Sequence, residues 1–275
     1  MCPRLRLFKT VRLCAILAVI SSTVLVGCKP LINQFAFHPD TTNVLSPEQL
    51  PLGIQELVVT NKDGLELRSL FLPSAQSEKL VIYFHGNAGN IYSRIPNLMT
   101  FNQAGLNVLG VGYRGYGRSE GSPSEEGLYQ DGATLFQYAK EELGYAEENI
   151  FILGRSIGST VAIETAQDKN IAGLILSTPL TSAKDIVKSS GFGWISSLAG
   201  NALDNLSKLD NLRAPLLVVH GTDDQITPYT MGVEIFEAAT VQKQLITIEG
   251  GDHNSLHIEY AQEYWPPILE FIERH

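Results

Sequence analysis

A Gly-x-Ser-x-Gly pattern occurs twice in the chain, around Ser156 and around Ser119. A serine in this pattern acts as a nucleophile when it lies on a sharp turn between a strand and a helix. Ser156 follows the apolar residues 150–153 and precedes residues 159–167, which have helical spacing, whereas Ser119 lies in a glycine-rich loop that leads to Pro123. The context therefore predicts that Ser156, and not Ser119, is a nucleophile.

A serine hydroxyl needs a neighbouring imidazole as its base, and the imidazole needs a carboxylate to orient it. Of the six histidines, His253 lies in a glycine-rich loop that directly follows the predicted strand 245–248. Such loops carry the chemistry of open α/β sheets, so we expect His253 to be the base. His85 and His220 also end predicted strands and are interpreted as structural, while His257 is expected at the surface of the last helix.

Three carboxylates are candidates for the orienting acid. Asp223 and Asp224 follow the predicted strand 216–219, and Asp252 directly precedes His253. Each of them is expected at the edge of the sheet where the serine and the histidine meet, and position alone leaves all three open.

The loop at residues 85–90 has the sequence His-Gly-Asn-Ala-Gly-Asn and follows the predicted strand 80–84. Acyl transfer builds negative charge on a carbonyl oxygen, and two preorganised backbone N–H groups can stabilise it. We expect these oxyanion-hole donors to be the N–H groups of Asn87 and Ile157. Phosphate binding is the alternative for such a loop, but the lysine and the spacing of a P-loop are missing.

The elements that must position these residues alternate between short β-rich segments and helical stretches. Several of the strands are continuous apolar runs, which is typical of strands buried on both faces of a parallel sheet. The alternation predicts an α/β fold with a mostly parallel, doubly wound sheet and a first antiparallel hairpin that turns at residues 61–64. The predicted strands are 56–60, 65–72, 80–84, 108–112, 150–153, 173–177, 216–219 and 245–248, and the predicted helices are 94–103, 124–144, 159–167, 230–239 and 256–274.

An insertion between Pro179 and Pro215 is expected to form a small cap at about residues 181–213. Its two short helices are predicted at residues 181–190 and 193–206, with several apolar positions in each. Such a cap favours a partly apolar acyl pocket, and the alternative is simple packing of a helix on the sheet.

The first 27 residues have the pattern of a signal peptide. A basic stretch is followed by the uncharged residues 13–27, a run shorter than the roughly 20 apolar residues that a membrane-spanning helix needs. It ends in Leu-Val-Gly-Cys at residues 25–28, which resembles the lipobox of bacterial lipoproteins, in which the cysteine is lipidated. We expect lipid attachment at Cys28, a tether over residues 28–50 and a domain over residues 51–275; the alternative is an uncleaved anchor.

Charge and composition exclude several other classes of protein. With 44% hydrophobic and 18% charged residues, the chain is neither collagen-like, nor a long coiled coil, nor mostly disordered. The first 27 residues carry four basic residues and no acid, so their removal changes the formal net charge from -9 to -13. An acidic body repels phosphate backbones, so nucleic acid is not expected as a partner. The resemblance to bacterial lipoproteins, with Lys29 and not Asp after Cys28, implies a membrane-anchored lipoprotein outside the cytoplasm, at the outer membrane facing the periplasm.

Together the motifs resemble the α/β-hydrolase superfamily, in particular serine hydrolases that carry these loops in this order. The matching segments are His-Gly-Asn-Ala-Gly-Asn at 85–90, the Tyr-Arg-Gly-Tyr-Gly loop at 113–119, Gly-Arg-Ser-x-Gly at 154–158, His-Gly-Thr-x-Asp at 220–228 and Gly-x-His-Asn at 251–254. The resemblance covers about residues 50–275. It implies that Asp224 is the acid that orients the histidine, because the residue at the position of Asp223 varies in the family pattern. It also explains Ser119 as part of a loop that belongs to the family pattern.

The resemblance implies a serine hydrolase that cleaves small carboxylic esters or thioesters through an acyl-enzyme and a Ser156, Asp224 and His253 triad. It implies no metal and no organic cofactor. The alternatives are a peptidase of the same fold and a membrane-tethered binding protein that has kept the fold without catalysis.

Overall fold

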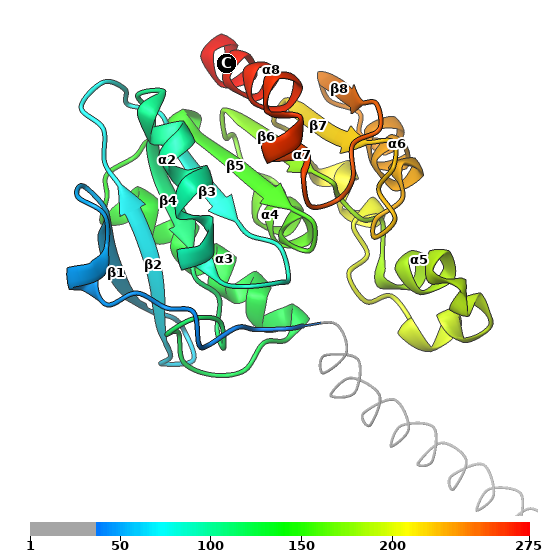
Figure 1. Cartoon of the computed structure of the whole chain (residues 1–275), viewed down its shortest axis with the longest axis horizontal. Coiled ribbons are helices and arrows are strands. Elements are labelled where there is room, and N and C mark those ends of the chain that lie inside the picture. Colours follow the sequence, from blue (N-terminus) through cyan, green and yellow to red (C-terminus); the bar gives the residue numbers. More distant parts are fainter. Residues whose placement is uncertain (1–36) are drawn as a thin grey trace, which may run out of the picture. The chain divides into compact units, whose positions relative to one another are not determined.

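The computed structural model describes residues 37–275 (Figure 1). The chain divides into the units Met1–Phe37 and His38–His275, and the described strands all lie in the second. The predicted signal peptide and Cys28 lie outside the described residues. Among the helices of the described part, none combines the length and the apolar composition that a membrane span requires.

The second unit contains one eight-stranded sheet with the order β1-β2-β4-β3-β5-β6-β7-β8. β1 pairs with β2, and β2 with β4, in antiparallel fashion, while every other pair is parallel. The predicted mostly parallel sheet and its first hairpin are thereby confirmed. The strands are β1 (Gln55–Thr60), β2 (Glu66–Leu72), β3 (Leu80–Phe84), β4 (Asn107–Val111), β5 (Ile150–Arg155), β6 (Gly173–Ser177), β7 (Leu216–Gly221) and β8 (Lys243–Ile248).

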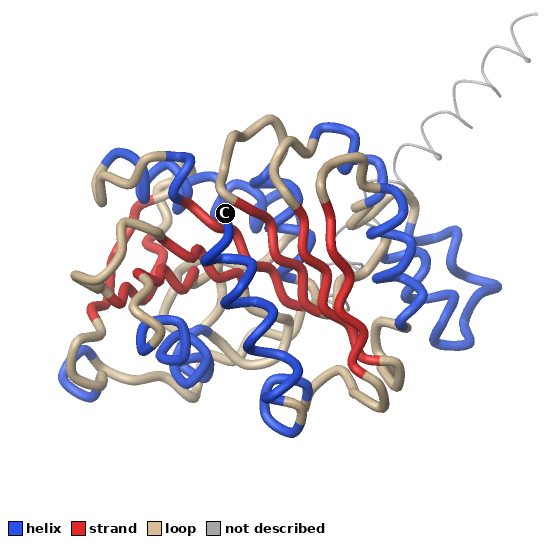
Figure 2. Tube along the Cα trace, turned by 90° about the horizontal axis from the view of Figure 1, so that it is seen from above, coloured by secondary structure: helices blue, strands red, loops and turns tan. Residues whose placement is uncertain are grey.

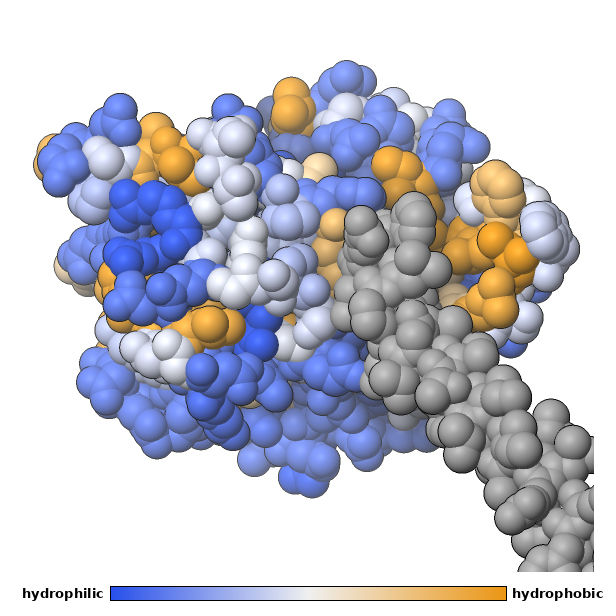
Figure 3. Space-filling view, turned by 90° about the horizontal axis from the view of Figure 1, so that it is seen from below, coloured by the Kyte–Doolittle hydropathy of each residue, from blue (hydrophilic) through white to orange (hydrophobic). Residues whose placement is uncertain are grey.

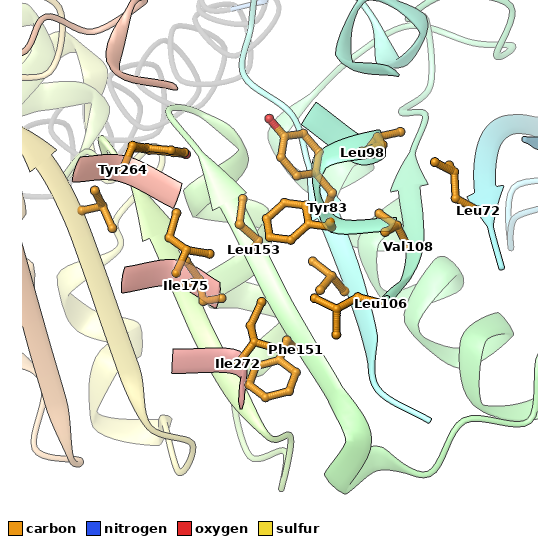
Figure 4. Packing of buried hydrophobic residues seen from close by; sticks show 14 of the residues in the cluster. Leu72, Tyr83, Leu98, Leu106, Val108, Phe151, Leu153, Ile175, Tyr264 and Ile272 are labelled. Atoms are coloured by element: carbon orange, nitrogen blue, oxygen red, sulfur yellow. The ribbon is translucent and has the colours of Figure 1, made fainter. Parts of the chain in front are cut away.

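Helices lie on both faces of the sheet (Figure 2). The five strands from β3 to β7 are buried at every residue, which explains their continuous apolar sequences. One hydrophobic core joins alternate residues of these strands to α2 and α8, including Leu153, Ile175 and Tyr264 (Figure 4). The main helices are α2 (Ile95–Gln103), α3 (Glu125–Glu141), α4 (Gly158–Ala166), α6 (Tyr229–Ala238), α7 (Leu256–Glu259) and α8 (Ala261–Arg274).

The last predicted helix, residues 256–274, is divided in two. Tyr260 separates α7 from α8 and has φ −109° and ψ 32°, outside the helical region. Its hydroxyl donates a hydrogen bond to the carbonyl of Gly250, 2.9 Å away, in the loop that precedes α7. This contact fixes the break, which periodicity alone does not reveal.

The insertion after β6 also differs from the prediction of two α-helices. It forms α5 (Ala183–Val187), a π-helical turn (Lys188–Phe192) and a 3-10 helix (Gly193–Ala199). Gly200 has φ +55°, which ends the second segment before the predicted end at residue 206. Phe192, Trp194 and Leu198 are exposed, and hydrophobic side chains gather at this end of the face in Figure 3.

A buried carboxylate, Asp131 on α3, connects three segments that support the loop after β3. It accepts hydrogen bonds from the backbone N–H and the guanidinium of Arg114 and, at 2.9 Å, from the Asn61 side chain. Arg114 stands between Tyr113 and Tyr116, whose rings pack against the imidazole of His85 with centroids 4.5 and 5.3 Å away. The charge pair therefore fixes the 113–119 loop behind residues 85–87.

We expect the Asp131→Ala substitution to lower the free energy of unfolding by about 3–5 kcal/mol, because it removes the buried counter-charge of the Arg114 guanidinium and leaves only the partly exposed Asp63 as its partner. Urea unfolding followed by circular dichroism measures the change. Asp210→Ala is the matched control, since Asp210 is exposed, and it should stay within about 0.5 kcal/mol of the unsubstituted protein. Equal destabilisation by the two substitutions would contradict this role of Asp131.

Candidate active site

Ser156 lies on the turn between β5 and α4, as the sequence predicted. Its φ is +52°, a value in the left-handed region that residues with a side chain adopt only when the surroundings enforce it. The Ser156 N–H donates to the carbonyl of Ser177 on the neighbouring strand β6, at 2.9 Å. This sharp turn presents the side chain at the carboxyl edge of the sheet.

The two glycines of the motif are required by the close packing around this turn. A Cβ atom on Gly154 would lie 2.5 Å from the carbonyl oxygen of Gly158 and 2.6 Å from the Ala162 Cβ. A Cβ atom on Gly158 would lie 2.2 Å from the carbonyl oxygen of Phe84 at the end of β3. Only glycine permits the helix to begin this close to two strands.

The loops after β7 and β8 bring Asp224 and His253 to the same edge. The Nε2 atom of His253 lies 2.9 Å from the Oγ atom of Ser156, and its Nδ1 atom lies 2.7 Å from the Oδ2 atom of Asp224. These distances fit a tautomer in which Nδ1–H donates to the carboxylate and Nε2 accepts from the serine hydroxyl. The structure thus assembles the three residues that the sequence singled out.

Asp224 is buried and fully engaged by hydrogen bonds. Its Oδ1 atom accepts from the N–H groups of Ile226 and Thr227, at 2.9 and 2.8 Å, and its Oδ2 atom accepts from the Thr227 hydroxyl at 3.0 Å. Burial acts to raise the pKa of Asp224, but hydrogen bonds from His220 and His253 outweigh it and hold the pKa well below its usual range. The carboxylate is therefore ionised beside His253.

The other two candidate acids lie away from the imidazole. Asp223 and Asp252 are both exposed, and the Asp252 carboxylate accepts hydrogen bonds from the N–H groups of Asn254 and Ser255, at 2.6 and 2.9 Å. These bonds lower the pKa of Asp252, and they direct its carboxylate to the backbone of its own loop and not to the imidazole of His253. Of the three, only Asp224 contacts His253 in the described structure.

The remaining histidines occupy different environments. His85 is fully buried, and desolvation lowers its pKa to about 3, so it is neutral. His220 is also buried, with Nε2 2.7 Å from the carbonyl oxygen of Thr227 and 3.2 Å from Asp224 Oδ2, so it supports the acid. His257 was expected at the surface; instead it is half-buried and lines the pocket beside Ser156, because α7 packs over that pocket.

Ser119, the serine of the second Gly-x-Ser-x-Gly pattern, is buried in a structural position. Its Oγ atom accepts from the N–H of Arg68 at 2.8 Å and donates to the carbonyl of Gly112 at 3.4 Å. No described histidine contacts it. The hydroxyl connects β2 to the 113–119 loop, so the repeated motif has two separate uses.

The predicted oxyanion donors flank the serine. Ile157 follows Ser156 directly, at the N-terminus of α4, and Asn87 lines the same pocket as Ser156. The Oδ1 atom of Asn87 accepts hydrogen bonds from the N–H of His38 and the hydroxyl of Tyr116, both at 2.8 Å. These bonds fix the Asn87 loop, and the N–H assignment itself stays a prediction.

A pocket of about 650 Å³ opens beside Ser156 and His253. Its wall includes Asn87, Arg94, Arg155, His257, Ile258 and Trp265, which come from the loop and the 3-10 turn after β3, from the end of β5 and from the helices α7 and α8. None of the residues that line this pocket comes from the insertion at 181–213, so the expected contribution of the cap to an acyl pocket stays a prediction.

Sequence reasoning missed the two arginines of this pocket and the polar support of Asp224. Arg155 lies inside the serine motif and Thr227 inside the Asp224 motif, so proximity to the catalytic candidates was the available signal. Arg94 carries no such signal, since only the fold brings it near Ser156. Within residues 37–275, no group of three His, Cys, Asp or Glu side chains is arranged to hold a metal ion; the expectation of no metal and no cofactor stays a prediction.

Comparison with solved structures shows the same architecture. The esterase Pf2001 of Pyrococcus furiosus superimposes with a TM-score of 0.73, at 19% sequence identity, over 87% of this chain and 98% of the esterase. At this identity the likeness concerns the fold. A family profile described as "Serine aminopeptidase, S33" matches residues 75–208, which include the serine motif but neither Asp224 nor His253.

Sequence relatives extend over almost the whole chain. The protein bem46 of Schizosaccharomyces pombe is 34% identical over 258 residues, covering 89% of this chain and 85% of that protein. The "Alpha/beta hydrolase domain-containing protein aho-3" of Caenorhabditis elegans is 29% identical over 206 residues, covering 74% of this chain and 60% of that protein. The sheet order, the turn at Ser156 and these relatives together show that the chain belongs to the α/β-hydrolase superfamily, alongside protein bem46.

Proposed function

We propose that this protein is a serine hydrolase that cleaves carboxylic esters or thioesters through an acyl-enzyme on Ser156. The observation that carries the proposal is the continuous chain of contacts from Ser156 Oγ through the two nitrogens of His253 to Asp224 Oδ2, at 2.9 and 2.7 Å. A nucleophile, a base and an orienting acid in this geometry perform acyl transfer on several unrelated folds.

The first half of the reaction forms the acyl-enzyme. The Ser156 oxygen attacks the carbonyl carbon of the substrate while His253 Nε2 takes the hydroxyl proton. The Asp224 carboxylate stabilises the resulting imidazolium, and the N–H groups of Asn87 and Ile157 stabilise the negative carbonyl oxygen. When the tetrahedral intermediate collapses, the bond to the alcohol or thiol breaks and His253 returns the proton to that leaving group.

The second half repeats these steps with water. A water molecule replaces the leaving group, His253 takes its proton, and the hydroxide attacks the acyl carbon. Collapse of the second intermediate releases the carboxylic acid and returns the proton to Ser156. His220 and Thr227 support both halves by holding Asp224 in place and ionised.

Ester or thioester cleavage is favoured over the aminopeptidase activity that the family profile names. An aminopeptidase must hold the positive amino terminus of a peptide, which calls for a carboxylate near the scissile bond. Among the described residues, the pocket beside Ser156 is lined by no Asp or Glu and carries two arginines instead. A binding protein without catalysis would not need the strained turn at Ser156.

We also propose that the hydrolase is a lipoprotein anchored through Cys28 outside the cytoplasm, at an outer membrane facing the periplasm. The lipobox-like residues 25–28 and the uncharged run at residues 13–27 support this proposal. Cys28 is the first residue of the proposed mature chain, and the other two cysteines belong to the removed segment.

For the Asp224→Asn substitution we expect kcat on 4-nitrophenyl acetate to fall by about 10⁴, because an amide in place of the carboxylate favours the wrong histidine tautomer. Asp223→Asn is the matched control and should retain kcat within a few-fold, since Asp223 is exposed and does not contact His253. Steady-state kinetics with Ser156→Ala as the blank measures both. Similar losses in the two variants would remove Asp224 from its role.

For the Cys28→Ser substitution we expect the protein to leave the membrane fraction or to accumulate as its precursor. A bacterial lipoprotein carries several acyl chains on this cysteine, which exceeds the one chain that binds a membrane only marginally. Cell fractionation and mass spectrometry of the N-terminal peptide make the measurement. Cys14→Ser is the matched control and should stay membrane-bound and processed. An unmodified Cys28 inside a longer peptide would support the uncleaved anchor instead.

A further inference from the structure

Two arginines converge on the pocket beside Ser156. Arg155 is the last residue of β5 and immediately precedes Ser156, while Arg94 ends the 3-10 turn Ile91–Arg94 before α2. Both line the pocket together with residues of the loop at 86–88. Arg155 is 6% exposed, so its positive charge is held inside the protein and not in bulk water.

Neither guanidinium has a carboxylate partner among the described residues. Arg94 donates through Nη2 to the carbonyl of Ala88, and Arg155 donates through Nη2 to the carbonyl of His253 at 2.6 Å. The Nε atom of Arg94 is buried without a hydrogen-bond partner. A buried charge and a buried donor are costly unless something pairs with them, so this arrangement is suited to an anionic ligand.

Other arginines of the chain differ in this respect. Arg114, only slightly exposed, is paired with Asp131 and Asp63, and the exposed Arg213 is paired with Asp168. In a chain of formal net charge -9, carboxylates are available in number, yet none from the described residues lines this pocket. Among these arginines, the two in the pocket are therefore distinguished by a positive charge that no described carboxylate neutralises.

The positive charges of Arg94 and Arg155 both affect the ionisation of side chains that line this pocket. Burial lowers the pKa of Arg94, and the positive charge of Arg155 lowers it further. Burial, followed by the charges of Arg155 and Arg94, lowers the pKa of His257 to about 4, so this side chain of the pocket wall is neutral at pH 7. The Nδ1 atom of His257 is buried and has no hydrogen-bond partner, which adds a neutral polar group to the same wall.

We propose that this pocket binds a negatively charged oxyacid group of the substrate, and that the preferred substrates are esters or thioesters carrying a carboxylate or phosphate near the scissile carbonyl. This inference rests on the proposed function of Ser156. Arg94 is the specificity-determining residue, because a guanidinium presents paired donors that match the two oxygens of such a group. Arg155 adds charge and also holds the His253 loop through its carbonyl.

The test compares esters of similar size that differ in charge. For the acyl side, 4-nitrophenyl hydrogen glutarate is compared with 4-nitrophenyl pentanoate. For the leaving-group side, the acetate esters of 4-hydroxybenzoate and of 4-hydroxyphenyl phosphate are compared with the acetate ester of methyl 4-hydroxybenzoate. The measured quantity is the ratio of kcat/KM for the anionic ester to that for its neutral partner.

For at least one of these pairs we expect kcat/KM for the anionic ester to exceed that for the neutral ester by about tenfold or more. The pair that shows this preference tells whether the pocket binds a carboxylate or a phosphate, and whether that group belongs to the acyl part or to the leaving group. Arg94→Gln should reduce that ratio by about tenfold, and added salt should reduce it in the unsubstituted protein. Arg213→Gln is the matched control, since Arg213 is exposed at a distant ion pair, and it should leave the ratio unchanged.

Cleavage of the neutral esters by Ser156 with no preference for any anionic partner would overturn this inference and leave the proposed function intact. If no ester is cleaved, the proposed function fails. A binding experiment then tests separately whether the pocket takes an anion. The Ser156→Ala protein is then titrated with glutarate and with inorganic phosphate, using glutaramide as the neutral control, and its melting temperature is followed. Saturable stabilisation that Arg94→Gln abolishes supports the anion pocket, and the absence of stabilisation by both anions overturns it.

Discussion

The close approach of β5, β3 and α4 around Ser156 is the constraint on which the site depends. Gly154 and Gly158 allow backbone contacts that a Cβ atom would prevent, and in return the turn between them forces Ser156 to φ +52°. That conformation costs of order 1–3 kcal/mol and persists because buried parallel strands fix both ends of the turn. The position of the nucleophile is therefore set by packing deep in the sheet.

The other parts of the site are joined to this turn by polar contacts. Arg155 links the end of β5 to the carbonyl of His253, so the strand that carries the serine also holds the loop that carries the base. Asp224 reaches His253 from β7 and is itself held by Thr227 and His220. Each catalytic candidate is thus attached to a different strand, and their geometry follows from the register of the parallel sheet.

Sequence reasoning located the strands, Ser156 and His253 from local signals: apolar runs, glycine spacing and loops after strands. Those signals left three candidate acids open, and only the family resemblance selected Asp224. Sequence reasoning was wrong about the continuous last helix and the two cap helices, where a side-chain contact of Tyr260 and a positive φ at Gly200 decide the path. It also missed Arg94 and the half-buried His257. Their meeting beside Ser156 depends on how α2 and α7 pack over the sheet edge, which no local pattern encodes.

The central claim is that Ser156 is an activated nucleophile. Labelling of the folded protein with a fluorophosphonate, followed by mass spectrometry of the labelled peptide, tests it most directly, because the reagent reacts with serines that have a positioned base. We expect one label per chain, on Ser156, that persists in Ser119→Ala and disappears in Ser156→Ala and after unfolding. A label that persists in Ser156→Ala, or a folded protein that takes up no label, would contradict the claim.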